Sequence, residues 1–260
     1  MSSIYYRKED FCVKKPLRSF IFFTSLLFSF SLSAQELSKN NLSEIKTYKY
    51  TFSNQDDFVV SFADYPKGQE QFYELQFKKN TFLPNEIKTG ARSLKISGNN
   101  HSDDLFMFAY KKISGLKANT RYHVSFSLEF ASNAPNDSVG TGGSPGSSVF
   151  VKIGAVNQKP QRSLDEANNY RMTLDKGNQA TDGKDMVLIG TVGVNTHDSI
   201  YRLKTLPYQP DEEMQAKLDD YCVTSNNKGE VWVVFGTDSA YESTSTIFYT
   251  NLITSFEELK

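Results

Sequence analysis

Acidic side chains stand next to the most apolar segments of this sequence, where they could bind a cation or a sugar. His101, Asp103 and Asp104 directly precede the apolar run at 105–113. Paired carboxylates suit calcium, which takes six to eight oxygen ligands. The sequence therefore makes Asp103 and Asp104 candidates for a structural calcium ion. The alternative is a solvated turn that caps the strand.

Further polar side chains sit at strand ends or along one strand face. Asp238 and Glu242 follow the apolar run 231–235, where an ordinary polar loop is the alternative. Glu129 shares a face of the segment 122–130 with His123, and that face could grip a sugar or simply meet solvent. The full set of ligand-binding candidates is Asp64, Tyr65, His101, Asp103, Asp104, Glu129, Asp175, Asp238 and Glu242.

Signatures of catalysis are weak. A glycosidase needs two carboxylates about 5–10 Å apart, with the pKa of one of them raised. Asp103, Glu129, Asp238 and Glu242 could supply such a pair, but nothing in the sequence places any two together. The Gly-x-Ser-x-Gly nucleophile elbow is absent. We therefore predict no catalytic residues, and keep a polysaccharide hydrolase or lyase as the alternative.

The sequence predicts that these residues are positioned mainly by β-strands. From residue 58 the chain falls into short alternating or apolar runs bounded by Gly, Pro, Asn and Asp, the pattern of an antiparallel β-sandwich. The expected strands are 72–77, 91–97, 105–113, 122–130, 149–156, 186–192, 231–235 and 246–252. One helix is expected at 211–220, with Asp211 as its N-cap. We predict an all-β jelly roll in a single domain, 57–260.

The first 34 residues predict a secretory signal peptide. Basic residues at 14, 15 and 18 precede an uncharged apolar run at 20–34, which small residues close. An uncleaved membrane anchor is the alternative, although the run is short for a hydrocarbon layer of about 30 Å. Residues 35–56 are polar and are expected to form an irregular lead-in. The product is predicted to be periplasmic or secreted, without stable membrane insertion.

The net charge of the chain bears on which classes of partner it can bind. The whole chain has 29 Lys and Arg against 30 Asp and Glu; the leader holds five basic and two acidic residues, which leaves 24 against 28. Nucleic-acid binding normally requires a basic stripe, and anionic membranes require a polybasic patch. A mildly acidic chain favours neither partner.

Two segments carry a family resemblance. Residues 115–126 follow the pattern Gly-Leu-x-x-x-Thr-x-Tyr-x-Val-Ser-Phe, which resembles the start of a strand in jelly-roll carbohydrate-binding modules. Residues 247–252 resemble the last strand of these modules, with Thr250 and Asn251 where the modules usually have Asp-Asp or Asp-Asn. The resemblance implies a jelly-roll sandwich similar to galactose-binding-like domains.

Shorter phrases extend this resemblance to a group of exported bacterial jelly-roll proteins over 58–252. They are 62–66, 100–108, 143–146, 170–172, 175–178 and 236–239. A shared fold is only an analogy for function. The leading hypothesis is an exported, non-catalytic β-sandwich that binds carbohydrate or another extracellular ligand, such as a periplasmic glycan, and that could hold a structural calcium ion. A structural or adhesive surface protein is a third alternative.

Overall fold

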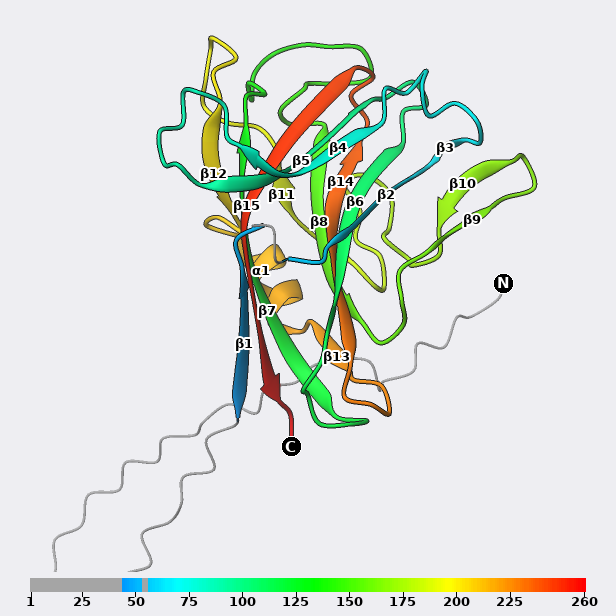
Figure 1. Ribbon diagram of the computed structural model, residues 1–260, viewed down its shortest axis with the longest axis vertical. Helices are drawn as coiled ribbons and strands as arrows, with labels where there is room; N and C mark the ends of the chain where they lie inside the picture. The colour runs from blue at the N-terminus through cyan, green and yellow to red at the C-terminus, as the bar shows by residue number, and fades with distance from the viewer. Residues whose placement is uncertain (1–43, 53–55) are drawn as a thin grey trace, which may run out of the picture.

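The computed structural model describes residues 44–52 and 56–260 (Figure 1). The expected signal peptide lies outside the described residues. The chain is all-β apart from one described helix, and its main sheets are antiparallel and packed as a sandwich, as the sequence predicts. No helix among residues 44–52 and 56–260 combines the length and apolarity that a membrane crossing needs.

The larger sheet has seven strands. Its path is β12 (Arg202–Leu206), β7 (Arg121–Ser132), β15 (Thr244–Glu258), β5 (Arg92–Asn99) and β4 (Gln76–Phe82), with β1 (Ile45–Tyr50) beside β15 and β13 (Cys222–Thr224) beside β7. The long strand β15 pairs with β5 along its first part and with β1 along its second part. The sheet is therefore organised around β15 and β7, which pair along most of their length.

The smaller of the two main sheets has five strands. Its order is β11 (Val187–Thr191), β8 (Val149–Val156), β14 (Val231–Ser239), β6 (Leu105–Ile113) and β2 (Val59–Ala63). Strands β8 and β6 begin and end as the sequence predicts. Their apolar residues lie on both faces, which is typical of strands covered on both sides.

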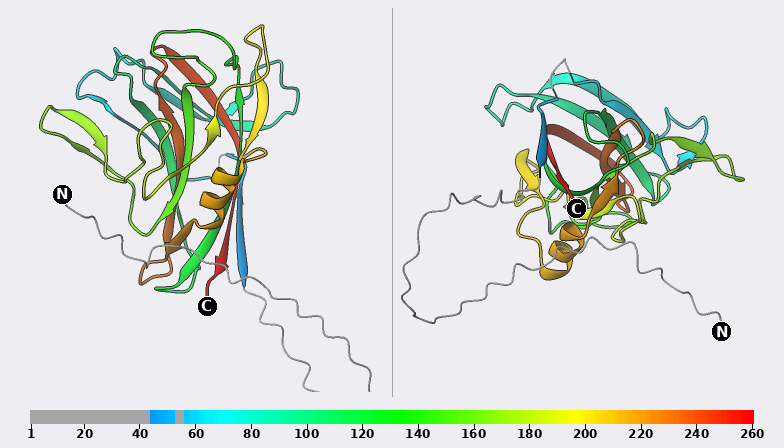
Figure 2. Two further views of the ribbon diagram at one scale, coloured as in Figure 1. Left: turned by 180° about the vertical axis from the view of Figure 1, so that it is seen from behind. Right: turned by 90° about the horizontal axis from the view of Figure 1, so that it is seen from below.

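Three short strands project from one side of the sandwich, as Figure 1 shows: β3 (Tyr65–Pro66), β10 (Asn169–Met172) and β9 (Arg162–Leu164). The helix α1 (Glu212–Asp219) lies on the outside of the sandwich (Figure 2). Asp211 caps it by accepting a hydrogen bond from the Met214 backbone N–H, which confirms the predicted N-cap.

The main core lies between the two large sheets and is rich in aromatic rings. Phe235 of β14 packs against Tyr249 of β15, with ring centroids 4.8 Å apart. The alternating residues of β7 from Tyr122 to Phe130 are buried, as their period of two predicts. Aromatic packing across the sandwich therefore holds the two sheets together.

A second, smaller cluster covers the other face of the five-stranded sheet. Phe106 and Phe108 of β6 and Val234 of β14 are buried there. Leu174 and Met186, from the connection between β10 and β11, pack on this cluster. That connection thus lies over the outer face of the sheet, and it brings its own polar residues with it.

Three sequence expectations need correction. Residues 45–50, expected to be irregular, form strand β1 because they pair with β15 over six residues. Residues 72–75, expected to be extended, form a turn in which the Tyr73 N–H donates to the Gln69 carbonyl. The polar segment 157–172, expected to be a loop, contains β9 and β10.

Candidate functional site

The candidate site is a cluster of charged side chains on the outer face of the five-stranded sheet. Asp238 of β14 is its centre and is fully buried. Residues two apart on a strand share a face. Asp238 therefore shares a face with Gly236, whose cross-strand partner in β8 is Lys152. This diagonal placement brings the carboxylate and the ammonium together across two strands.

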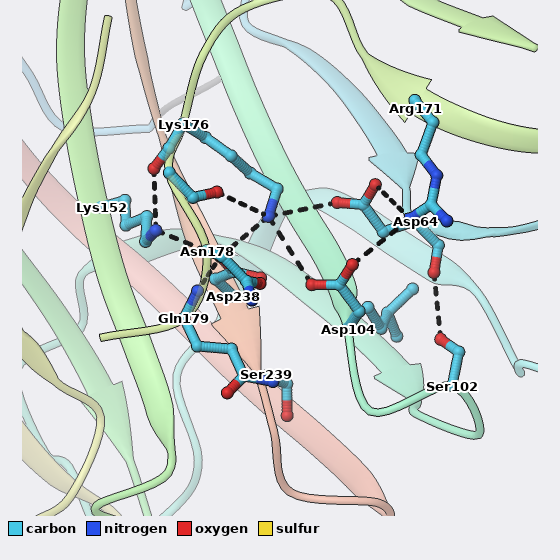
Figure 3. Close-up of polar contacts among 12 residues, drawn as sticks. Asp64, Ser102, Asp104, Lys152, Arg171, Lys176, Asn178, Gln179, Asp238 and Ser239 are labelled. Carbon is cyan, nitrogen blue, oxygen red and sulfur yellow. Dashed lines mark hydrogen bonds and ion pairs between the residues drawn. The ribbon is translucent and has the colours of Figure 1, made fainter. Parts of the chain in front are cut away.

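Two lysines share the Asp238 carboxylate, as Figure 3 shows. Its Oδ2 lies 3.2 Å from Lys152 Nζ and 2.8 Å from Lys176 Nζ. It also accepts a hydrogen bond of 2.8 Å from the backbone N–H of Gln179. A buried charge is tolerated only when it is paired and hydrogen-bonded. Asp238 meets that condition on one of its two oxygens, since Oδ1 has no hydrogen-bond partner.

Lys152 is fully buried and has three acceptors. Its Nζ donates to the carbonyls of Lys176 and Thr181, at 2.7 and 2.8 Å, and contacts Asp238. Burial lowers the pKa of Lys152, although Asp238 acts in the opposite direction. Because both carbonyl acceptors belong to the connection between β10 and β11, Lys152 fastens that connection to the sheet.

Lys176 is carried on that connection, which a tight turn shapes. Gly177 has φ of +71°, and a Cβ there would lie 2.2 Å from the Thr181 carbonyl oxygen, so only glycine fits. The Asp175 carboxylate accepts hydrogen bonds from the backbone N–H groups of Gly177 and Lys184. Asp175, a candidate from the sequence, thus orders the turn that presents Lys176.

The Lys176 ammonium lies among three carboxylates. Besides Asp238, it contacts Asp64 Oδ2 at 3.2 Å and Asp104 Oδ1 at 3.8 Å. Burial alone would lower the pKa of Lys176, but Asp238, Asp64 and Asp104 outweigh it, and the net pKa is raised. The Phe106 ring centroid is 5.2 Å from Nζ, which adds a cation–π contact. Lys176 therefore stays charged.

Arg171 closes the cluster on its outer side. Its guanidinium reaches Asp64 Oδ1 at 3.1 Å, Asp104 Oδ2 at 3.3 Å and Asp165 Oδ2 at 2.9 Å. Backbone hydrogen bonding from Asn169 and the contact with Arg171 lower the pKa of Asp165 to about 2. Arg171 is 44% exposed, so it stands between the buried charges and solvent.

The two remaining carboxylates differ in exposure. Asp64 is 5% exposed, and Asp104 is 30% exposed. Burial raises the pKa of Asp64 against the pull of Lys176 and Arg171. Burial also raises the pKa of Asp104, to about 6, against the pull of Lys176. Asp104 therefore changes its charge in mildly acidic solution.

A pocket of about 260 Å³ lies at the cluster, and Asp64 and Lys176 form part of its wall. Asp104 and Arg171 stand in its wall, and Asn178 lines it from the connection between β10 and β11. The pocket therefore combines a carboxylate, a guanidinium and an amide, a set that can exchange hydrogen bonds with hydroxyl groups.

A metal ion could use the same carboxylates. One oxygen from each of Asp64, Asp104 and Asp238 lies within 4.8 Å of the others. Carboxylate oxygens are the ligands that calcium prefers. The ammonium of Lys176 lies among them, however, and supplies the positive charge that they require. A calcium ion would have to displace it, so the residues do not fit calcium while Lys176 is in place.

The structure brings together only part of the residue set that the sequence suggested. Asp64, Asp104 and Asp238 converge, with Asp175 beside them. Asp103, paired with Asp104 in the calcium hypothesis, is exposed and lies outside the three-carboxylate group, although its carbonyl accepts a hydrogen bond from Gln179.

The other candidates lie apart from the charged cluster. Tyr65 is buried, and its hydroxyl donates to Glu70. His101 stacks on Phe72, with ring centroids 4.1 Å apart. Glu129, on the larger sheet, accepts hydrogen bonds from Thr250 and Asn251 at an irregularity of β15.

Glu242 is also outside the cluster, in the connection between β14 and β15, where its backbone N–H donates to the Thr141 carbonyl. The cations Lys152, Arg171 and Lys176 were missed as site residues. Lys152 had a signal, because it is the one charged residue in the apolar run 149–156. A lysine in a strand that is buried on both faces requires a buried acidic partner.

The comparisons with solved structures show weak similarity. One is a carbohydrate-binding module in complex with β-1,4-galactotriose, which is 8% identical to this chain. The alignment covers 78% of this chain and 89% of the module, with a TM-score of 0.32. A mannan-recognising module is 9% identical, with coverage of 82% and 98% and a TM-score of 0.32. An adhesin domain of Lys-gingipain from Porphyromonas gingivalis is 9% identical, with coverage of 80% and 97% and a TM-score of 0.34.

Carbohydrate-binding modules, the class that the sequence resembles, are thus among the solved structures similar to this chain. At these TM-scores the similarity carries no argument about function. No family model and no curated protein matches the chain.

We expect the substitution Asp238→Ala to destabilise the protein strongly. It leaves the buried ammonium groups of Lys152 and Lys176 without their shared carboxylate, and breaking a buried pair in this way costs about 3–5 kcal/mol. Urea unfolding measures the loss. The exposed Asp57 offers a matched control, and Asp57→Ala should change the free energy of unfolding by less than about 0.5 kcal/mol. Equal effects of the two substitutions would refute the role given to Asp238.

Calcium should be unnecessary for the stability of the protein. We expect neither a chelator nor added calcium to shift the thermal midpoint, because Lys176 already balances the three carboxylates. The variant Lys176→Ser should have a lower midpoint, and calcium should raise it, since an ion that binds only the folded state stabilises that state. A fall in the wild-type midpoint on chelation would show that the ammonium does not replace a metal.

The Asp104 carboxyl should make stability depend on pH between about 4 and 6. Its pKa is higher in the folded chain, about 6, than the ordinary value of 3.8. The folded state therefore holds more protons in this window, and the contribution of Asp104 to stability falls as pH rises through it. Relative to Asp104→Asn, the wild-type midpoint should decline from pH 4 to pH 7. Asp57→Asn should keep the wild-type profile, and parallel profiles for wild type and Asp104→Asn would contradict the assignment.

Proposed function

We propose that this protein is an exported carbohydrate-binding β-sandwich that holds its ligand without cleaving it. The observation that carries the proposal is the pair formed by Asp104 and Arg171 at the pocket above the buried charges. Both side chains are partly exposed, and they lie 3.3 Å apart. A sugar hydroxyl can donate a hydrogen bond to the carboxylate while its neighbour accepts one from the guanidinium.

The cluster beneath this pair fixes its geometry. Arg171 is held by Asp64 and Asp165, and Asp64 is held by Lys176. Side chains that are already ordered lose little conformational entropy when a ligand binds. The buried charges thus prepare Asp104 and Arg171 for recognition, even though the ligand does not touch the deepest of them.

The connection between β5 and β6, which carries Asp104, also carries a ring that packs on an exposed aromatic side chain. His101, three residues earlier in the chain, stacks on Phe72, whose side chain is 60% exposed. Rings exposed in this way can pack against the apolar face of a sugar. The family resemblance at 115–126 and the apolar leader at 20–34 support the same reading, a carbohydrate-binding module placed outside the cytoplasm, in the periplasm or secreted.

The burial of Asp64 supports binding without cleavage. A glycosidase places two carboxyl groups on either side of the glycosidic bond. Here Asp64 is almost completely buried, and its carboxylate is engaged by Arg171 and Lys176. Asp64 lines the pocket with Asp104, but because both of its oxygens contact cations, it is less available than Asp104 to act on a sugar.

A polysaccharide hydrolase or lyase is the second candidate, on one specific observation. The pKa of Asp104 is raised to about 6, and a carboxyl with a raised pKa can serve as a general acid. In that case Asp104 would donate a proton to the leaving oxygen. A second group at suitable distance would still be required.

Affinity electrophoresis through gels that contain single polysaccharides tests the proposal. We expect the protein to be retarded by at least one neutral polysaccharide. Asp104→Asn should weaken that binding by about tenfold or more, because hydrogen bonds to charged groups contribute about 1.5–3 kcal/mol. Asp57→Asn, with a carboxylate lost at an exposed position, should bind like the wild type.

The same polysaccharides, incubated with the protein, are assayed for new reducing ends and for unsaturated products. We expect neither. Product release that Asp104→Asn abolishes would favour the second candidate over the first. Migration unaffected by every neutral polysaccharide would overturn the binding proposal at this pocket.

A further inference from the structure

A second cavity lies beside the edge strand β12, away from the charged cluster. It has a volume of about 560 Å³. Ligand pockets of proteins usually fall between about 300 and 1,000 Å³. Its wall comes from β12, from Tyr208 just after that strand, and from two connections that carry Asn136 and Asn195.

The charged residues of this cavity are all cationic. Arg202 and Lys204 of β12 line it, and no Asp or Glu does. The two residues are two apart on one strand, so they share a face. Neither forms an ion pair with a carboxylate in the part of the chain that the structure describes; Lys204 Nζ donates to the carbonyl of Gly193 at 2.6 Å. Within residues 44–52 and 56–260, the positive charge of the cavity therefore has no carboxylate paired with it.

The Lys204 ammonium is partly desolvated. Burial lowers its pKa, and no acidic neighbour acts in the opposite direction. This contrasts with Lys176, which three carboxylates keep charged. An anionic group entering the cavity would supply the partner that Lys204 lacks, and the partial burial would strengthen the resulting attraction.

The remaining wall suits a sugar ring. Tyr208 lines the cavity and is 69% exposed. Tyr and Trp rings with one apolar face open to solvent are typical of binding surfaces. The amides of Asn136 and Asn195, both on exposed residues, can donate and accept hydrogen bonds with hydroxyl groups.

We propose that the cavity beside β12 binds a uronic acid residue of an acidic polysaccharide, with the sugar carboxylate at Arg202 and Lys204 and the ring against Tyr208. Arginine is well suited to a planar carboxylate because its guanidinium can donate two parallel hydrogen bonds. This site goes beyond the pocket at Asp104. The two sites would recognise different sugars, one through neutral hydroxyls and one through a carboxylate.

Binding to polygalacturonate, alginate and hyaluronan, measured by affinity electrophoresis, tests the proposal. We expect at least one of the three to retard the wild-type protein. Lys204→Met and Tyr208→Ala should each weaken that binding at least tenfold. Lys88→Gln, which removes the charge of an exposed lysine elsewhere, should leave it unchanged. Thermal unfolding of each variant verifies that it is folded, and the exposed position of Tyr208 makes its substitution the safer of the two.

A polymer whose carboxylates are esterified distinguishes recognition of the carboxylate from general binding of sugars. Methyl-esterified polygalacturonate has the same backbone without free carboxylates. If polygalacturonate binds, its ester should not. Equal binding of both forms, unchanged binding by Lys204→Met and Tyr208→Ala, or no binding to any of the three acidic polymers would each overturn the proposal.

The outcomes for the two sites are distinguishable. Failure of the Asp104 proposal leaves neutral polysaccharides unbound, while acidic polymers still bind in a manner that depends on Lys204. If the β12 proposal fails, the protein should still bind neutral polysaccharides, and Asp104→Asn should still weaken that binding.

Discussion

The fully buried Asp238 carboxylate, shared by two lysine ammonium groups, is the interaction on which the outer face of the five-stranded sheet depends. Two of its partners, Lys176 and the Gln179 backbone, belong to the connection between β10 and β11. Lys152 fastens the same connection through backbone carbonyls. Ionic contacts and the packing of Leu174 and Met186 thus act together. The connection is therefore a fixed wall of the sandwich, and it holds Arg171 and Asp104 in a defined arrangement.

In the charged cluster, a side chain of the protein itself supplies positive charge among the carboxylates. Three carboxylates close together repel one another unless a cation lies among them. Lys176 supplies that cation from the chain itself, with Phe106 beneath it. An ammonium group imposes a less strict geometry on its acceptors than a metal ion imposes on its ligands. The carboxylates therefore need only lie near Lys176. One consequence is that Asp104 can remain partly exposed.

Much of the fold could be predicted from the sequence, and the site only in part. The alternation at 122–130 and the apolar runs at 105–113 and 149–156 correspond to β7, β6 and β8. Asp64, Asp104 and Asp238 were recognised as candidates. Their convergence was beyond sequence reasoning, because it depends on which strands are neighbours in the sheet. The strand containing Asp238 continues to Ser239, where the polar composition suggested a loop. Lys176 was missed because a lysine in a polar connection is ordinarily solvated.

Strand β15 joins the parts of the larger sheet that come from both ends of the described chain, since β1, β5 and β7 all pair with it. Synthesis runs from the N-terminus, so β1, β5 and β7 exist before the strand that lies between them. The larger sheet cannot close until residues beyond Thr244 have emerged. Until then, β1 and the edges of β5 and β7 that face β15 lack the strand with which they pair. Closure of the larger sheet therefore depends on the last strand of the described residues, although that strand pairs with the first of them.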